Sequence, residues 1–270
     1  MPGRARPASP ERDTPLARHD LGVIRVLIAG VTGWTGAPLA RAVEAAPDLE
    51  LAGGVARRDG DYSSVAEALA AVPADVVVDY TSAAAVRGNV DAALAAGAHV
   101  VVGSSGLSES DYAEIDALAR EAGRGVIAAG NFSVFAATLL HAATVASQHV
   151  SHWEVIDYGS SGKPDVPSGT SRELAERLGA ASPADHDADL IGPPEARGAT
   201  VAGTHIHSLR LPGYSLSTDV ILATAHERLV IRHEAGSSAE PYIAGTLLAV
   251  RRVPSVTGVV RGLDRLLFGE

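Results

Sequence analysis

The sequence predicts an α/β protein with two domains: a doubly wound, parallel-sheet (Rossmann-like) nucleotide domain and a second α+β domain built on an open mixed sheet. In the first half, short runs of Val, Ile and Leu have the character of strands that are apolar on both faces, and helical segments of about ten residues separate them. A glycine-rich loop follows the first of these strands. In the second half, longer runs alternate polar and apolar residues, which favours a mostly antiparallel sheet with one exposed face.

The elements of the nucleotide domain alternate without interruption. The expected strands span residues 23–30, 49–56, 74–82, 98–106 and 124–130, and the expected helices span residues 37–47, 63–73, 84–97 and 109–123. Each helix separates two strands, as the crossover connections of a parallel sheet require. Ligands of such sheets bind at the carboxyl ends of the strands, so the loops that follow the strands are the first place to look for a site.

The second half has a different character. A helix is expected over residues 134–148, a strand over 152–159, a helix over 171–178 and further strands within 205–235, with a loop rich in Pro, Asp and Gly at 183–198. A helix over residues 241–254 then returns to the first domain, and residues 256–268 close the chain. We therefore divide the chain into a disordered leader (1–22), a dinucleotide-binding domain (23–130 plus 245–270) and a substrate-binding and oligomerisation domain (131–244), with the active site in the cleft between the two domains.

Composition disfavours several classes of function. The 270 residues are 46% hydrophobic, but no apolar run reaches the roughly 18 residues of a membrane span. The formal net charge of −10 disfavours binding to nucleic acid or to an acidic membrane surface. The absence of cysteine excludes disulfides, thiol nucleophiles and zinc–thiolate sites, and it is compatible with a reducing compartment. The leader lacks the apolar segment of a secretory signal, so we expect a cytoplasmic protein.

The first strand ends in the sequence GVTGWTG, which contains Gly30, Gly33 and Gly36. Glycines at this point let the backbone approach a pyrophosphate, and the following helix start offers free N–H donors and partial positive charge. The position between a strand and a helix favours dinucleotide binding over an ordinary tight turn. The residues expected to contact the cofactor in this loop are Gly30, Thr32, Gly33, Trp34, Thr35 and Gly36.

The end of the second strand indicates which dinucleotide binds. Sites for NAD usually carry an acid there, which binds the ribose 2′-hydroxyl, whereas this sequence has Arg57 and Arg58. Two guanidinium groups suit a 2′-phosphate, so NADPH is predicted in preference to NADH; the alternative is a pair of solvated surface arginines. Two further loops follow strands where such a fold places the nicotinamide. Their expected contacts are Gly103, Ser104, Ser105, Gly106, Asn131, Phe132 and Ser133.

The loop at residues 158–171 holds no histidine, glutamate or cysteine, and it combines small residues with Lys163 and a helix start. Ser168, Gly169 and Thr170 open an amphipathic helix, whose free N–H groups and hydroxyls form a seat for a carboxylate. The alternative is that Ser168 or Thr170 only caps the helix, but a cap needs no lysine. A small anionic substrate is therefore expected. The predicted substrate-binding residues are Lys163, Ser160, Ser168, Gly169 and Thr170.

These motifs resemble those of the dihydrodipicolinate reductase family. The segment KPDVPSGT, residues 163–170, resembles the family signature K-x-D-A-P-S-G-T, and GSSG stands where the family has G-T-T-G. The resemblance extends over residues 23–267 and includes the three glycines of the first loop and NFS at residues 131–133. It implies a Rossmann-like fold with a second domain, NAD(P)H-dependent reduction of a cyclic dicarboxylate imine in lysine biosynthesis, and a homotetramer.

One segment departs from the family pattern. Family members carry a histidine-rich run, usually H-H-x-H-K, whose first histidine is taken as the acid that protonates the reduced substrate; here residues 159–162 before the lysine are Gly-Ser-Ser-Gly. The catalytic candidates are therefore Lys163, then Tyr158, then His207, while His233 is a further histidine of the predicted sheet. His205 and His207 form a His-x-His pair, but no carboxylate or cysteine lies at a suitable local spacing, so no metal site is expected.

Three functions remain open on this basis. The first is a divergent NADPH-dependent reductase of a small cyclic imine, or unsaturated imine, that bears a carboxylate, in a specialised biosynthetic pathway. The second is the lysine-pathway enzyme itself with a different proton source, which the extent of the resemblance favours and the missing histidines oppose. The third is a non-catalytic protein that binds NADPH and an anion. A positioned acid is typically worth about 10²–10⁴-fold in rate, so its loss impairs such a reduction without abolishing it.

Overall fold

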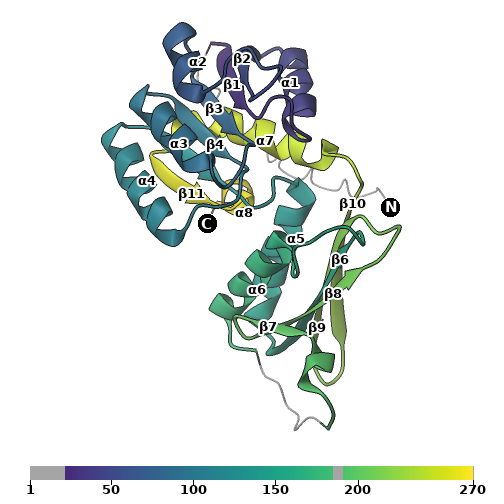
Figure 1. Ribbon diagram of the computed structural model, residues 1–270. Helices are drawn as coiled ribbons and strands as arrows, with labels where there is room; N and C mark the ends of the chain where they lie inside the picture. The colour runs from purple at the N-terminus through teal and green to yellow at the C-terminus, as the bar shows by residue number, and fades with distance from the viewer. Residues whose placement is uncertain (1–21, 185–190, 270) are drawn as a thin grey trace, which may run out of the picture.

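The computed structural model describes residues 22–184 and 191–269. Figure 1 shows two lobes, each built around its own sheet, and the C-terminal segment lies in the same lobe as the first half of the chain. The leader expected at residues 1–22 lies outside the described residues except for Gly22. Among the described helices, none combines the length and the apolar character needed to cross a membrane.

The first lobe contains a six-stranded sheet in the order β11-β5-β4-β3-β1-β2, and all its pairings are parallel. Its strands are β1 (Ile24–Ala29), β2 (Leu49–Val55), β3 (Val76–Asp79), β4 (His99–Val102), β5 (Gly125–Ala128) and β11 (Gly258–Arg261). Its helices are α1 (Gly36–Ala45), α2 (Val65–Ala71), α3 (Val86–Ala95), α4 (Glu109–Glu121), α7 (Glu240–Arg252) and α8 (Leu263–Phe268). The doubly wound sheet predicted from the sequence is confirmed.

Helices cover both faces of this sheet. Side chains at successive strand positions point to opposite faces. In β1, Val26 and Ile28 pack with α1, α7 and α8 on one face, while Leu27 and Ala29 pack with α2, α3 and α4 on the other. All of these β1 side chains are fully buried. Burial on both faces explains why the strands of this lobe are continuous apolar runs without polar alternation.

The second lobe is built on a five-stranded sheet in the order β10-β9-β6-β8-β7. Its strands are β6 (His152–Gly159), β7 (Ala199–Val201), β8 (Thr204–Arg210), β9 (Leu216–Ala223) and β10 (Arg228–Ala235). The pair β6–β8 is parallel, and the other three pairs are antiparallel. A short 3₁₀ helix, Pro194–Arg197, precedes β7. This is the open mixed sheet expected from the sequence.

Two helices, α5 (Val134–Ser147) and α6 (Gly169–Ala181), cover one face of the second sheet. Val155 and Val220 of the sheet are fully buried against this layer, together with Leu174 of α6. The side chains of Leu229 and Val230 in the edge strand β10 remain about half exposed. One face of the sheet is thus buried in a core, which produces the alternating pattern seen in the sequence.

Residues 256–268, for which the sequence suggested no particular element, form β11 and α8. β11 adds a sixth strand to the parallel sheet by pairing with β5, Val259 opposite Val126. In α8, the buried Asp264 accepts a hydrogen bond of 3.0 Å from Arg177 of α6. This ion pair connects the two lobes through the last helix of the chain.

Candidate active site

A cavity of about 340 Å³, here called the cleft, is lined by residues of both lobes. The first lobe contributes the loops at the carboxyl ends of β1, β3, β4 and β5, as a doubly wound sheet predicts. The second lobe contributes the end of β6, the loop before α6 and parts of β9 and β10. The sequence-predicted residues that line the cleft are Trp34, Thr35, Gly103, Ser105, Asn131, Phe132, Tyr158, Lys163, Ser168, Gly169 and Thr170.

A second cavity of about 1020 Å³, here called the nucleotide pocket, lies at the ends of β1, β2 and β3. Tyr80 lines both this pocket and the cleft. The predicted cofactor residues that line it are Gly30, Thr32, Gly33, Arg57 and Arg58. The predicted residues that line neither cavity are Gly36, Ser104, Gly106, Ser133 and Ser160.

The glycine loop between β1 and α1 is too tightly folded for side chains. Gly30 has a φ of 87°, and a Cβ atom there would collide with the carbonyl oxygen of Tyr80. A Cβ on Gly36 would collide in the same way with the carbonyl oxygen of Gly30. Gly33 N donates to Gly30 O at 2.9 Å and closes the turn. Gly36 therefore allows the close approach of the loop backbone to the start of α1, although it lines neither cavity.

The rim of the nucleotide pocket carries two arginines. Arg57 and Arg58 directly follow β2, and both side chains are exposed. Within residues 22–184 and 191–269, neither has an ion-pair partner. Ser63 and Ser64 line the same pocket. A tight glycine turn at a helix start with two unpaired guanidinium groups beside it fits a phosphate-bearing dinucleotide.

Asp79, at the end of β3, is a residue that the sequence analysis missed. Its carboxylate is fully buried and accepts hydrogen bonds from Thr81 Oγ1 at 2.9 Å, Ser104 Oγ at 2.5 Å and Asn89 Nδ2 at 2.7 Å. These bonds tie together the loops after β3 and β4, which border the two cavities. Ser104 thus supports the loop from below instead of lining the cleft. The available signal was an acid at the end of the otherwise apolar run VVVD.

The N-terminus of α6 borders the cleft. Ser168 is the N-cap and accepts a hydrogen bond from Ser171 N at 3.3 Å. Thr170 Oγ1 accepts a hydrogen bond from Asn131 Nδ2 at 3.1 Å, which connects α6 to the loop after β5 in the other lobe. Ser168 is therefore both a helix cap and a cleft residue, so the two interpretations of this residue are compatible.

Lys163 lines the cleft, but its charge already has a partner. Its Nζ lies 2.6 Å from Asp165 Oδ1. Burial opposes ionisation of Asp165, yet the neighbouring ammonium group holds the pKa of Asp165 below its usual value. Ser160 is exposed, and its carbonyl oxygen accepts a hydrogen bond from Lys163 N at 3.1 Å. The expected positive charge is thus present in the cleft and is balanced by a carboxylate two residues away.

A buried ion pair supports this loop from the sheet. Asp157 of β6 is 1% exposed, and its Oδ2 accepts from Arg210 Nη2 at 2.7 Å and from Ser168 N at 2.8 Å. Arg210 also donates to the carbonyl oxygen of Asp165 at 2.7 Å. Burial would raise the pKa of Asp157, but Arg210 and Ser168 together hold it below its usual value. The pair fixes the start of α6 and the Lys163 loop relative to the sheet.

Tyr158 lines the cleft beside this loop. Its hydroxyl donates to Asp219 Oδ2 at 3.0 Å, and Arg232 binds the same carboxylate with Nη2 at 2.5 Å. Burial and the Asp219 carboxylate both raise the pKa of Tyr158. The phenol proton is therefore engaged within the protein and is harder to release than in a free tyrosine.

The sheet histidines lie in different surroundings. His207 follows the core residue Ile206, so its side chain points away from the helices, and its Nε2 lies 2.6 Å from Glu154 Oε2. His207, third among the predicted catalytic candidates, does not line the cleft. His233 does, with its Nε2 3.4 Å from Ser133 Oγ, and burial lowers its pKa. The sequence could not separate these histidines, because the choice depends on which face of each strand meets the cleft.

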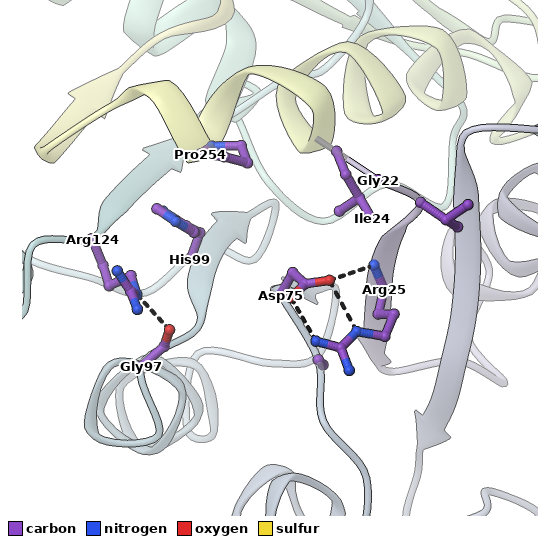
Figure 2. A pocket seen from close by; sticks show the side chains of 10 residues that line it. Gly22, Ile24, Arg25, Asp75, Gly97, His99, Arg124 and Pro254 are labelled. Atoms are coloured by element: carbon purple, nitrogen blue, oxygen red, sulfur yellow. Dashed lines mark hydrogen bonds and ion pairs between the residues drawn. The ribbon is translucent and has the colours of Figure 1, made fainter. Parts of the chain in front are cut away.

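A third pocket, of about 520 Å³, lies at the amino ends of β1, β3 and β4 (Figure 2). Figure 2 shows Arg25 held by Asp75 and Arg124 bound to the carbonyl oxygen of Gly97. Arg25 Nη2 lies 2.8 Å from Asp75 Oδ1. Ligands of doubly wound sheets bind at the opposite, carboxyl ends of the strands, so this pocket is not the candidate active site. Across the described residues, no group of three or more His, Asp or Glu side chains is placed to hold a metal ion.

Comparison with solved structures supports the fold. A dipicolinate-bound dihydrodipicolinate reductase from Paenisporosarcina sp. TG-14 matches with a TM-score of 0.81 at 22% identity, over 90% of this chain and 99% of that one. An amine dehydrogenase from Mycobacterium smegmatis matches with a TM-score of 0.65 at 13% identity, over 92% of this chain and 97% of that one. At these identities, the likeness concerns the fold alone.

Comparison of sequences identifies the family. The 4-hydroxy-tetrahydrodipicolinate reductase of Streptomyces coelicolor is 36% identical over 250 residues, which cover 90% of this chain and 98% of that protein. The protein of the same name from Beutenbergia cavernae is 37% identical over 250 residues, which again cover 90% of this chain and 98% of that protein. Family models described as the N-terminus and the C-terminus of dihydrodipicolinate reductase match residues 24–132 and 132–267. The chain therefore belongs to the dihydrodipicolinate reductase family and is an NAD(P)H-dependent oxidoreductase.

Proposed function

We propose that this protein uses NADPH to reduce the C=N bond, or a conjugated C=C bond, of a small cyclic imine that bears a carboxylate. One observation carries the proposal: residues of the nucleotide lobe and the start of α6 line the same cavity. A hydride donor held by the first lobe and an anion held at α6 therefore meet in one space. Its volume of about 340 Å³ is at the small end of the range for ligand sites, which suits a substrate of one ring.

The cofactor half of the proposal concerns the nucleotide pocket. NADPH, when bound, supplies the hydride. Thr32 and the start of α1 offer backbone donors for its phosphates, and Gly33 lines the same pocket. Arg57 and Arg58 line the pocket at the end of β2, and under this proposal they bind the 2′-phosphate, which NADH lacks. Trp34 and Gly103 line the cleft and limit the space open to the nicotinamide end.

The substrate half concerns the start of α6 and Lys163. Free N–H groups at a helix start bind carboxylates, and the Thr170 hydroxyl lies beside them. Lys163 can turn from Asp165 towards a bound carboxylate, because both members of this pair are partly exposed. Asp157 and Arg210 do not need to bind substrate; their pairing holds the loop in place.

The test is NADPH consumption, followed by absorbance, with a panel of cyclic imino acids that carry one or two carboxylates, alongside NADPH binding by fluorescence. Turnover of at least one member, with a lower KM for NADPH than for NADH, is the expected result. Binding of NADPH without turnover of any member would overturn the proposed reaction while leaving the cofactor site intact. A clear preference for NADH would overturn the assignment of the arginines.

A second candidate substrate is 4-hydroxy-tetrahydrodipicolinate itself. The names of relatives that match over 98% of their length favour it, as does the match to the KxDAPSGT motif. The absence of the histidine run favours another imine in a specialised pathway. Comparison of kcat/KM for the dicarboxylate and for one-carboxylate imines in the panel decides between them.

We also propose that the chain assembles as a homo-oligomer, a tetramer by family resemblance, through the sheet of the second lobe. The half-exposed Val230 on β10, which points away from the face covered by α5 and α6, supports this proposal. We further propose that the chain is divided into a dinucleotide-binding domain (23–130 plus 245–270) and a substrate-binding and oligomerisation domain (131–244). Light scattering of the wild type and of Val230→Asp tests the assembly: a smaller particle for the variant is expected, and a monomeric wild type would refute it.

A further inference from the structure

The cleft contains a histidine that lies far along the chain from the position where the family's histidine run would stand. In the part of the chain that the structure describes, His233 is the only histidine that lines the cleft. It lies on β10, opposite Thr218 of β9, which in turn lies opposite Asp157 of β6. This row of side chains shares one face of the sheet, the face covered by α5 and α6. The sheet therefore presents the imidazole ring to the cleft from the side of the second lobe.

The contacts of His233 leave its ring available to a ligand. Its Nε2 lies 3.4 Å from the hydroxyl of Ser133, which is the N-cap of α5 and accepts from Ala136 N at 3.3 Å. A contact of 3.4 Å is at the long limit for a hydrogen bond. Ser133 N donates to Asn131 Oδ1 at 2.8 Å, and Asn131 lines the cleft and binds Thr170. His233 is thus connected through Ser133 and Asn131 to the start of α6, where we place the substrate carboxylate.

The other charged groups around the cleft are engaged with one another. Asp157 pairs with Arg210, and Lys163 pairs with Asp165. On β10 itself, Arg232 and Glu234 flank His233 in sequence and point to the opposite face of the sheet, where Arg232 meets Asp219 of β9. Tyr80, Tyr158 and Tyr242 are the remaining titratable residues that line the cleft. With no carboxylate bound to the ring, burial is what lowers the pKa of His233.

Resting on the proposed function, we propose that His233 is the catalytic acid that protonates the substrate nitrogen. The Nε2–H bond of the imidazolium breaks, and its electron pair remains on the ring. The proton bonds to the substrate nitrogen, which holds the electron pair released when hydride addition converts C=N to CH–N. The neutral ring then recovers a proton from water, so the balance is one imine, one hydride and one proton for each amine formed.

The alternatives in the cleft are less suited to this step. Tyr158 donates its proton to Asp219, and its raised pKa makes it a weaker acid. Lys163 is paired with Asp165 and is the group expected to turn towards the substrate carboxylate. His233, in contrast, lies in the cleft beside the Ser133 hydroxyl. Once protonated, a ring with a lowered pKa is also a stronger acid than an ordinary histidine.

This assignment predicts a particular pH dependence. In the free enzyme, the active imidazolium form is lost as pH rises through a pKa below the usual value of about 6.5, so kcat/KM falls with pH in that range. A bound substrate carboxylate favours the charged ring and raises its pKa. The fall in kcat is therefore expected at a higher pH than the fall in kcat/KM.

The experiment compares His233→Gln with the wild type and with His207→Gln, a matched control on the other face of the sheet. The best imine of the panel is used between pH 5 and pH 9. We expect His233→Gln to lower kcat/KM at pH 5.5 by about 10²–10⁴-fold and to lose the fall with rising pH. NADPH binding should remain unchanged, which shows that the variant is folded. His207→Gln should keep the wild-type profile.

Two results would overturn the assignment. One is a His233→Gln enzyme that keeps the wild-type pH profile with kcat/KM within about threefold. The other comes from NMR titration of the His233 ring, which needs no turnover: its pKa should rise when picolinate, a stable aromatic imine carboxylate, is bound with NADP⁺. An unchanged pKa in that complex would show that the ring does not face the ligand. If no imine is turned over, the proposed function fails, and this titration still decides the role of His233.

Discussion

The nucleotide pocket and the loop at residues 158–171, here called the substrate loop, differ in whether their charged side chains have partners. At the nucleotide pocket, Arg57 and Arg58 are exposed and have no acidic partner in the described part of the chain. In the substrate loop and the sheet beneath it, Lys163 is paired with Asp165, and Arg210 is paired with Asp157. Both regions line cavities at the ends of strands, but only the first presents cations that still lack a counter-charge.

This difference indicates how each region binds its ligand. Unpaired guanidinium groups gain most from a ligand that brings its own negative charge, such as a phosphate. Paired charges gain less, because a ligand must displace an existing partner. In the substrate loop, we therefore expect the ion pairs to serve mainly to fix the backbone N–H groups of α6, which under the proposed function bind most of the carboxylate. Mutations in the two regions should accordingly differ in kind: loss of stability in one, loss of affinity in the other.

The largest effect is expected from Asp157→Asn. This change leaves the Arg210 guanidinium without its carboxylate, and only 13% of the Arg210 side chain is exposed. Removing one partner of a buried pair typically costs about 3–5 kcal/mol, so the free energy of unfolding should fall by about that amount. Urea unfolding followed by circular dichroism measures it. The double variant Asp157→Asn/Arg210→Met removes the unpaired charge and should regain part of the loss.

The pH dependence of the wild type provides a second measure of the same pair. The pKa of Asp157 is lower in the folded protein than in the unfolded chain. Its contribution is therefore fully present above the unfolded carboxyl value of about 3.9, and it is lost as pH falls through the lower folded pKa. The stability difference between wild type and Asp157→Asn should shrink in that acidic range. If Asp157→Asn lowered the free energy of unfolding by less than about 1 kcal/mol at pH 7, the ion pair would not be a structural support, and the two regions would not differ in this respect.

The next effect is expected from the double variant Arg57→Ala/Arg58→Ala. Hydrogen bonds to charged groups are worth about 1.5–3 kcal/mol, so KM for NADPH should rise by about 10–100-fold. KM for NADH should change little, because NADH lacks the 2′-phosphate. Unfolding in urea should match the wild type, since both side chains are exposed. An equal rise in KM for both cofactors would place these arginines away from the 2′-phosphate.

The glycine loop and the start of α6 were predictable from the sequence, because their signals are local: a residue type next to a strand or helix boundary. The pairing of Lys163 with Asp165 is also local, since two residues separate them. Asp79 was missed, and His233 was named but not ranked among the catalytic candidates, for a different reason. Their roles depend on neighbours from other strands, such as Ser104 for Asp79 and Ser133 for His233. The four-residue strand β11 is too short to give a pattern of its own.

A smaller effect is expected from Lys163→Ala. Its ion pair with Asp165 is partly exposed, so stability should change by about 1 kcal/mol or less. If Lys163 turns towards the substrate, kcat/KM for the imine should fall by about tenfold, mainly through KM, while KM for NADPH stays the same. Steady-state kinetics with Lys163→Met as a matched variant measures this change. Unchanged kinetics in both variants would leave the α6 start as the whole carboxylate seat.

The smallest effect is expected outside both regions, from Asp75→Asn in the pocket of Figure 2. The side chains of Arg25 and Asp75 are 38% and 41% exposed, so their pair should contribute about 1 kcal/mol or less to stability. This contribution should diminish in about 1 M salt, which screens exposed charges. Because the pair lies at the amino ends of the strands, kcat and both KM values should match the wild type. A change in KM for either ligand would show that this pocket is coupled to the cleft through the strands, and the contrast would then extend to both ends of the sheet.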